Sequence, residues 1–115
     1  MKGVLEHKSF QFSIRIVNVS NYLKEQKSEY TISKQLLRSG TSIGANIAEA
    51  QFAQSKADFV TKMHISLKEA SETRYWLELL LATKYITQEE YNSLLIDCNQ
   101  LINMLVSTIK TTKNE

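Results

Sequence analysis

Apolar residues recur at helical spacing in four stretches of this chain, and short polar segments separate the stretches. In the first stretch, Phe10, Ile14 and Val17 lie three or four residues apart, but residues 10–16 also alternate apolar and polar as a half-buried strand does. A single strand would have no partner strand elsewhere in the chain. The pattern therefore favours a helix over residues 9–26 with a wide apolar face.

The second stretch predicts a helix over residues 31–52. One face carries apolar residues three, four or seven positions apart, namely Ile32, Leu36, Ile43, Ile47 and Ala50. Glycines inside this stretch each cost roughly 1 kcal/mol relative to alanine. A phosphate-binding loop is disfavoured because the Gly-Lys-Ser/Thr ending and a preceding strand are both missing. Small residues instead recur every four positions as a stripe on one face of this helix, at Gly40, Gly44 and Ala48. This spacing predicts that another helix packs closely against that face.

Two further stretches predict helices over residues 56–83 and 88–111. Each begins with a capping-box pattern, Ser55 with Asp58 and Thr87 with Glu90. The apolar seam of the third helix is predicted at Val60, Met63, Leu67, Ala70, Leu77 and Leu81, with Arg74 interrupting it. The seam of the fourth is predicted at Tyr91, Leu94, Cys98, Leu101, Leu105 and Ile109. Four helices and three short connections predict an all-α, up-down-up-down antiparallel four-helix bundle, a single domain over residues 1–115.

Composition narrows the class of protein further. The 115 residues include no proline, three glycines and one cysteine, which argues against an antiparallel β-fold, a disulfide framework and a Cys-rich zinc site. No apolar run is long enough to span a membrane, and the first residues lack the apolar core of a secretory signal. We therefore expect a cytoplasmic protein without a membrane partner. The net charge of +2 permits an anionic partner without requiring one.

The sequence offers little catalytic chemistry. A di-iron bundle needs Glu-x-x-His pairs, but Val4 and Thr61 stand three residues before the two histidines, His7 and His64. Cys98 occupies a core position, where a cysteine usually behaves as a small apolar residue. No Gly-x-Ser-x-Gly motif is present. We expect no catalytic residue, no cofactor and no metal ion, and therefore no enzyme.

One group of polar residues stands out from the helical pattern. Asn46 and Glu49 share a face of the second helix, and Arg74 interrupts the third. A buried arginine without a carboxylate partner would be very costly, so pairing of Arg74 with Glu49 is expected at a bundle or subunit interface. The favoured interpretation is a structural clasp that fixes helix register. The alternative is a pocket for a ligand or nucleic acid.

Basic residues supply candidate nucleic-acid contacts. They lie near the first connection and along the third helix, at Lys24, Lys27, Lys34, Arg38, Lys56 and Lys62. Within a single monomer this dispersed set is weak evidence for nucleic-acid binding. A symmetric ring would repeat the set, and the electrostatic fields of the copies would add. A second feature favours self-association, because Tyr75, Trp76, Leu79 and Leu80 extend the apolar surface of the third helix beyond one core.

Two segments resemble a known family. Residues 33–50, which include Arg38, Gly40, Gly44, Asn46 and Glu49, resemble the second-helix signature of the 23S ribosomal RNA intervening-sequence proteins. Residues 67–77, with Glu69, Glu72, Arg74 and Trp76, resemble the third-helix signature, and the likeness extends over nearly the whole chain.

The resemblance implies a four-helix bundle assembled as a homo-oligomeric ring, a homopentamer, with no known catalytic residues. Related proteins include the accessory variability determinants of diversity-generating retroelements, which partner a reverse transcriptase and nucleic acid. Residues that match the motifs, such as Gly40, Gly44, Glu69 and Arg74, are then expected to be architectural. The leading hypothesis is a ring that binds RNA or DNA through repeated basic surfaces. The alternative is a scaffold that recruits a nucleic-acid enzyme and contacts nucleic acid little.

Overall fold

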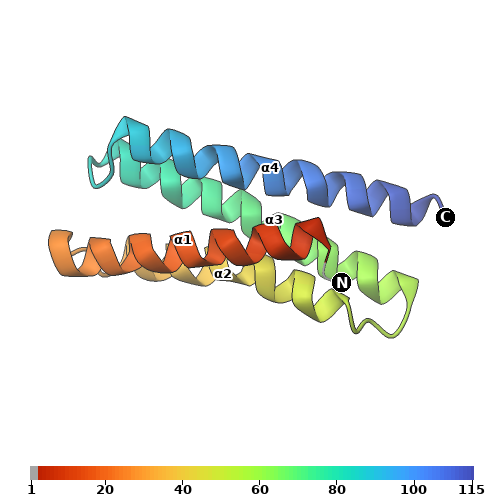
Figure 1. Ribbon diagram of the computed structural model, residues 1–115. Helices are drawn as coiled ribbons and strands as arrows, with labels where there is room; N and C mark the ends of the chain where they lie inside the picture. Colours follow the sequence, from red (N-terminus) through yellow and green to blue (C-terminus); the bar gives the residue numbers. More distant parts are fainter. Residues whose placement is uncertain (1–2) are drawn as a thin grey trace.

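The computed structural model describes residues 3–115 and contains four helices in this part of the chain (Figure 1). They are α1 (Val4–Lys27), α2 (Ile32–Ala50), α3 (Lys56–Ala82) and α4 (Gln88–Lys113). Each helix packs against the next one along the chain, and α4 returns to contact α1, so that α1 and α3 lie at diagonal corners. The all-α, up-down-up-down antiparallel bundle is thus confirmed. The molecule measures 46 × 23 × 20 Å.

The helix ends differ from the predicted ones by a few residues. The first helix begins at Val4, five residues before the predicted start, and ends where Ser28 adopts a left-handed conformation with φ 52°. The second begins after Glu29, whose carboxylate accepts hydrogen bonds from three backbone N–H groups at residues 31–33, the shortest being 2.7 Å. These contacts satisfy N–H groups that have no acceptor within the helix. The second helix ends at Ala50, two residues before the predicted end.

The start of α4 matches its predicted capping box. Thr87 Oγ1 accepts from the Glu90 N–H at 3.1 Å, and Glu90 Oε1 accepts from the Thr87 N–H at 2.8 Å. At the start of α3, Ser55 caps the Asp58 N–H as predicted, at 3.1 Å. The return bond differs, because the Asp58 carboxylate accepts from the N–H of Gln54 rather than from Ser55.

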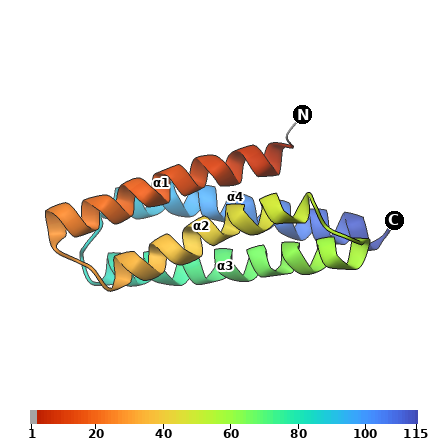
Figure 2. The same ribbon diagram turned by 90° about the horizontal axis from the view of Figure 1, so that it is seen from below.

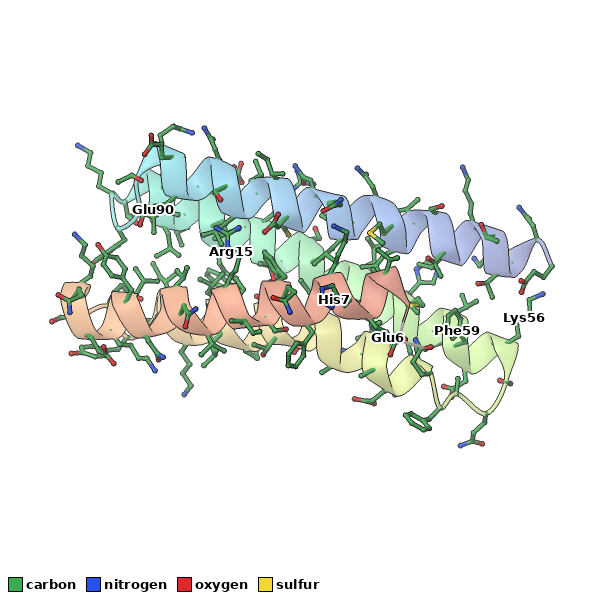
Figure 3. The ribbon with its side chains drawn as sticks, viewed as in Figure 1. Glu6, His7, Arg15, Lys56, Phe59 and Glu90 are labelled. Carbon is green, nitrogen blue, oxygen red and sulfur yellow. The ribbon has the colours of Figure 1, made fainter. Side chains whose placement is uncertain are left out.

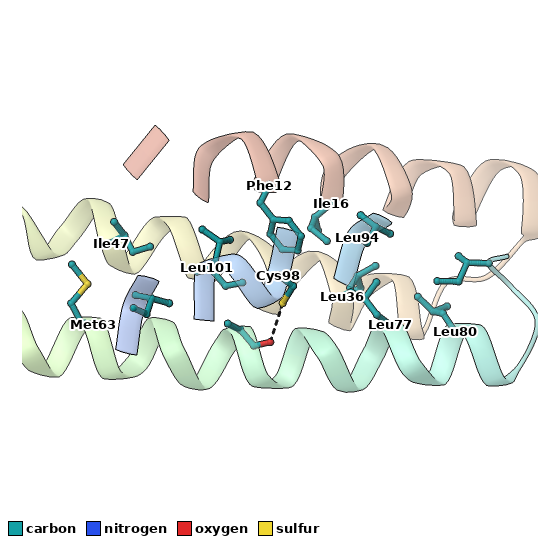
Figure 4. Close-up of a cluster of buried hydrophobic side chains, with 14 of the residues drawn as sticks. Phe12, Ile16, Leu36, Ile47, Met63, Leu77, Leu80, Leu94, Cys98 and Leu101 are labelled. Atoms are coloured by element: carbon teal, nitrogen blue, oxygen red, sulfur yellow. Dashed lines mark hydrogen bonds between the residues drawn. The ribbon is translucent and has the colours of Figure 1, made fainter. Parts of the chain in front are cut away.

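The core lies where the patterns of α2 and α4 placed it. In α4, Leu94, Cys98, Leu101, Leu105 and Ile109 are all buried, as predicted. In α2, Leu36, Ile43, Ile47 and Ala50 are buried, and Ile32 packs at the edge of the core. Figure 4 shows these side chains interleaved with those of α1 and α3. Burial of these apolar side chains provides the main stabilisation of the bundle.

The predicted seam of α3 is confirmed at Met63, Ala70 and Leu77, whereas the predicted Val60, Leu67 and Leu81 are only partly buried at the edge of the core. The buried residues are Met63, Ser66, Ala70, Thr73, Leu77 and Leu80. Thr73 therefore occupies the core position that was assigned to residue 74, and Arg74 is exposed. The Ser66 hydroxyl donates to the Ile43 carbonyl at 2.8 Å, and the Thr73 hydroxyl bonds Ser39 Oγ at 3.0 Å. The Thr73 hydroxyl also bonds the Glu69 carbonyl of its own helix at 2.8 Å. Because both hydroxyls have hydrogen-bond partners, they can be buried at little cost. Leu80 belongs to the core and not to the outer apolar surface.

The apolar residues of α1 divide between two opposite faces. Phe12, Ile16 and Leu23 face the core, and each is at most 2% exposed. Phe10, Ile14 and Val17, which the spacing suggested as the inner face, are 64%, 43% and 40% exposed. The prediction of a helix here is confirmed, but these three residues point away from the core. The helix therefore carries an apolar stripe that its own bundle leaves uncovered.

The small residues of α2 lie where this helix approaches α1. A Cβ atom at Gly40 would lie 2.8 Å from two side-chain carbons of Ile16, and one at Gly44 would lie 3.2 Å from Ser13 Oγ. Ala48, the third member of the predicted stripe, is exposed. In Figure 2 the N-terminal half of α1 rises away from the other helices. The close approach therefore involves Gly40 and Gly44 and weakens toward Ala48.

Candidate nucleic-acid and protein interfaces

Three of the predicted basic residues gather at one end of the bundle. Lys24 and Lys27 lie in the last turn of α1, and Lys34 lies in the first turns of α2. The α3–α4 turn, which contains Lys84, lies at the same end (Figure 1). The Lys27 ammonium lies 6.0 Å from the centre of the Tyr22 ring. We call Lys24, Lys27, Lys34 and Lys84 the basic end. Exposed glutamates lie at the same end, Glu25 in the last turn of α1 and Glu89 and Glu90 in the first turn of α4. Lys84 is distant from the other three lysines in sequence, and only the antiparallel fold brings the two turns together.

The other three basic candidates do not join this surface. Lys56 and Lys62 lie at the start of α3, at the opposite end of the bundle, where Figure 3 labels Lys56. Lys62 forms an ion pair of 3.1 Å with Glu49, and Lys56 donates to the carbonyl of Glu115 at 2.7 Å. The six candidate residues are therefore dispersed over the bundle within one chain.

Arg38 belongs to a polar network between α2 and α3. Its guanidinium pairs with Glu69 at 3.2 Å and also with Glu72, whose carboxylate accepts from the Trp76 indole N–H at 2.8 Å. The hydrogen bonds from Trp76 and Arg38 lower the pKa of Glu72, and the bond to Glu72 raises the pKa of Arg38. The network fixes the register of the two helices. Opposite charges on two antiparallel neighbours were the available sequence signal for this pairing.

The predicted clasp of Asn46, Glu49 and Arg74 does not form within the chain. Glu49 pairs with Lys62, and the Asn46 side-chain amide donates to the Ser42 carbonyl of its own helix at 2.8 Å. The reason is the antiparallel register, in which the end of α2 lies beside the start of α3. Arg74 lies farther along α3, where it is exposed and needs no buried carboxylate.

A second polar link joins α1 to α4. Arg15 forms a 2.6 Å ion pair with Asp97 and donates to the carbonyl and hydroxyl oxygens of Ser93 at 3.3 and 2.9 Å. Figure 3 labels Arg15 on the side of α1 that faces α4. Arg15 was not among the residues predicted from the sequence, because nothing in α1 alone indicates which helix it faces.

The single cysteine of the chain, Cys98, lies in the interior. The Cys98 thiol is fully buried and lies 3.5 Å from the Ala70 carbonyl, the contact dashed in Figure 4. Burial raises the pKa of this thiol to about 12, so it remains protonated at neutral pH. Within residues 3–115, no group of three or more His, Cys, Asp and Glu side chains is arranged to hold a metal ion. In the same range, no helix has the length and apolar character required to span a membrane.

A groove of about 510 Å³ runs between the N-terminal half of α1 and the C-terminal half of α2. Its lining includes Phe10 and Ser13 from α1 and Gly44, Ala45 and Ala48 from α2. The hydroxyls of Ser9, Ser13 and Thr41, which also line it, bond carbonyl oxygens of their own helices at 3.0, 3.0 and 2.6 Å. The walls are therefore mainly apolar. Glu6 and His7, labelled in Figure 3, lie at its N-terminal end.

Comparison with known proteins gives a family and several chains from solved structures that match this chain. Residues 4–107 match the family model described as 23S rRNA-intervening sequence protein. A solved structure of a protein of unknown function from the S23 ribosomal protein family of Bacteroides thetaiotaomicron is 54% identical, with a TM-score of 0.92. The match covers 93% of this chain and 96% of that one. None of the curated protein sequences matches the chain.

Proposed function

The chain belongs to the 23S rRNA-intervening sequence protein family, and on that basis we propose that it acts without catalysis, as a cytoplasmic homo-oligomeric ring that binds RNA or DNA. The ring is proposed to be a pentamer, as the family resemblance implies. Its nucleic-acid contact is the basic end of each copy. The observation that carries this proposal is the gathering of Lys24, Lys27 and Lys34 at one end of the bundle.

Symmetry turns this modest surface into a larger one. If the bundles stand side by side with their long axes along the ring axis, the basic ends of all copies meet on one rim of the ring. Each copy then adds its own lysines to the rim, together with Glu25, Glu89 and Glu90 of the same end. The lysines are the groups that would contact a phosphate backbone. A monomer with a net charge of +2 needs such repetition to bind nucleic acid firmly.

The test is a fluorescence-anisotropy titration with a structured RNA hairpin and a DNA duplex at two salt concentrations. We expect binding that weakens steeply with salt, because phosphate contacts release counterions. Lys27→Gln and Lys34→Gln should each weaken binding and reduce the salt slope by about one for every copy whose lysine contacts a phosphate, since each variant removes that lysine from all copies of the ring. Lys62→Gln is the matched control, since that lysine already pairs with Glu49 at the opposite end.

A scaffold is the second candidate function, and the pairing of Arg38 and Lys62 with glutamates supports it. Those ion pairs remove two cations from the surface available to phosphates. In this alternative the ring recruits a nucleic-acid enzyme and contacts nucleic acid little. Absence of binding to both the hairpin and the duplex at low salt would contradict the leading proposal and favour the scaffold.

A further inference from the structure

We propose that the groove between α1 and α2 is one side of the contact between copies, and that Tyr75 of the next copy occupies it. This inference rests on the ring of the proposed function and names its two mating surfaces. The first is the groove together with the exposed stripe of Phe10, Ile14 and Val17. The second is the outer face of α3, which carries Lys68, Tyr75 and Leu79.

The first surface has the properties of a protein contact. Phe10 is 64% exposed at the groove, and Ile14 and Val17 continue the apolar stripe along α1. The opposite wall of the groove is formed by the small residues Gly44, Ala45 and Ala48, which leaves room for a large side chain. Among residues 3–115, the charged or titratable groups that line the groove are Glu6 and His7, and both lie at one end. A contiguous apolar surface of this kind usually marks an interface.

The second surface lies on a different helix, α3. Tyr75 is 57% exposed, and Lys68 and Leu79 lie seven residues before it and four after it, on the same face of α3. Because α1 and α3 occupy diagonal corners of the bundle, their outer faces are two different surfaces of the molecule. A ring is closed by a contact between two different patches of the same chain. These two faces are different patches, and the contact gives a closed ring when it also turns each copy about the ring axis. A single self-complementary face would instead give a two-fold dimer.

The two surfaces agree in spacing and charge. Glu6 precedes Ser13 in the groove by seven residues, and Lys68 precedes Tyr75 by seven, so each pair spans about 10.5 Å along its helix. When Tyr75 of the next copy lies beside Ser13, its Lys68 therefore lies beside Glu6. Leu79 then falls opposite Val17, since each lies four residues farther on. An aromatic ring enters the apolar groove, and a cation meets the acidic end.

The direction of the helices also agrees. The matching spacing requires α3 of one copy to run parallel to α1 of its neighbour. In an up-down-up-down bundle, α1 and α3 run in the same direction. Rotation about an axis along the bundle preserves that direction in every copy. A ring of upright bundles therefore gives the parallel pairing, whereas a two-fold contact perpendicular to the bundle would make the helices antiparallel.

Crosslinking of mixed copies tests the contact directly. Ala45→Cys and Tyr75→Cys chains are co-expressed with different tags and treated with a short bismaleimide, to which the buried Cys98 is inaccessible. We expect a covalent dimer from the mixture and none from either variant alone. The double variant should give a covalent ladder that ends at the ring size. The control pairs Ala45→Cys with Ile96→Cys, an exposed position on α4, and should give no product.

The outcomes separate the inference from the proposal on which it rests. A native mass of several copies without the 45–75 product overturns this contact and leaves the ring standing. Crosslinking of Ala45→Cys with itself overturns it in favour of a two-fold dimer. A wild-type mass of 13.2 kDa at micromolar concentration overturns the ring and this contact together.

Charge reversal gives an independent measurement on the intact chain. Lys68→Glu places two acidic groups together and should shift the native mass toward 13.2 kDa. Adding Glu6→Lys should restore the assembly, and Lys110→Glu on α4 is the matched control that should leave the mass unchanged. Circular dichroism verifies that each variant keeps its helices. If the double variant assembles no better than Lys68→Glu alone, Glu6 and Lys68 do not meet.

Discussion

Replacing Gly40 by alanine tests how tightly α2 presses on α1. The new methyl group would lie 2.8 Å from Cγ1 and Cγ2 of Ile16 and 3.2 Å from its Cβ. Ordinary contacts between carbon atoms are about 3.5–4.0 Å. Ile16 is fully buried, and its branched side chain has few alternative rotamers. The methyl group can therefore be accommodated only if one helix moves.

Two effects of opposite sign decide the magnitude. Alanine in place of glycine inside a helix gains about 1 kcal/mol of helix propensity. Overpacking a well-packed core costs about 1–3 kcal/mol. Since the contact involves two carbons of a rigid side chain, we place the cost at the upper end of this range. The expected result is a net loss of about 1–2 kcal/mol in the free energy of unfolding.

Urea denaturation at one fixed protein concentration measures this loss, because the stability of an assembly depends on concentration. The midpoint should fall by roughly 0.5–1 M with an unchanged slope. Gly44→Ala is the matched control, since its Cβ would meet Ser13 Oγ at 3.2 Å and the Ser9 carbonyl at 3.3 Å. This variant should be about 1 kcal/mol more stable than Gly40→Ala.

A double-mutant cycle identifies the partner of the new methyl group. Ile16→Ala alone should cost about 2–5 kcal/mol. In the Gly40→Ala background the added methyl fills part of the space, so the double variant should be less destabilised than the sum by about 1 kcal/mol. A midpoint raised by Gly40→Ala would show propensity acting without a clash and would refute the close approach.

Three further predictions concern buried or networked groups. Glu72→Gln should lower the free energy of unfolding by at most about 1 kcal/mol near pH 7. Because folding lowers the pKa of Glu72, its stabilising contribution is complete above the usual glutamate pKa and is lost as the pH falls. The difference in urea midpoint between the wild type and the variant should therefore shrink at pH 3. Thr73→Val removes the buried hydroxyl bonded to Ser39 and should cost about 1 kcal/mol in the same assay; an unchanged midpoint would contradict a role for this bond. Cys98 should resist a thiol-reactive dye at pH 8 in the native protein and react once urea unfolds it, since burial raises its pKa to about 12; rapid labelling of the native protein would show that the core opens.

Several features of the fold could be predicted from the sequence because they depend on neighbours in the same helix. The seam of α4 is apolar at every predicted core position from Leu94 to Ile109, so its spacing alone identified the buried face. The capping box at Thr87 and Glu90 is likewise local, since both partners lie within one turn. Local patterns of this kind predicted the four helices and their order, and the helices with their short connections predicted the bundle.

The errors arose where burial or pairing depends on a different helix. The Thr73 hydroxyl forms a hydrogen bond with Ser39 Oγ of α2, which allows Thr73 to be buried. A pattern of apolar residues alone therefore omitted Thr73 and placed Arg74 in the core. On α1, Phe10 and Phe12 are equally apolar, and only contact with α2 and α4 determines which of them faces inward.

The sequence by itself determined the helices, their order and the absence of familiar catalytic motifs, because these depend on short-range spacing and residue type. Only the tertiary structure decided the partners of the charged residues. Arg38 forms ion pairs with Glu69 and Glu72, and Glu49 pairs with Lys62. These pairs form because the antiparallel packing of α2 on α3 determines which side chains lie close together. The same packing left one face of α1 uncovered and gathered lysines at one end, and the proposed contacts with nucleic acid and with a second copy depend on these two surfaces.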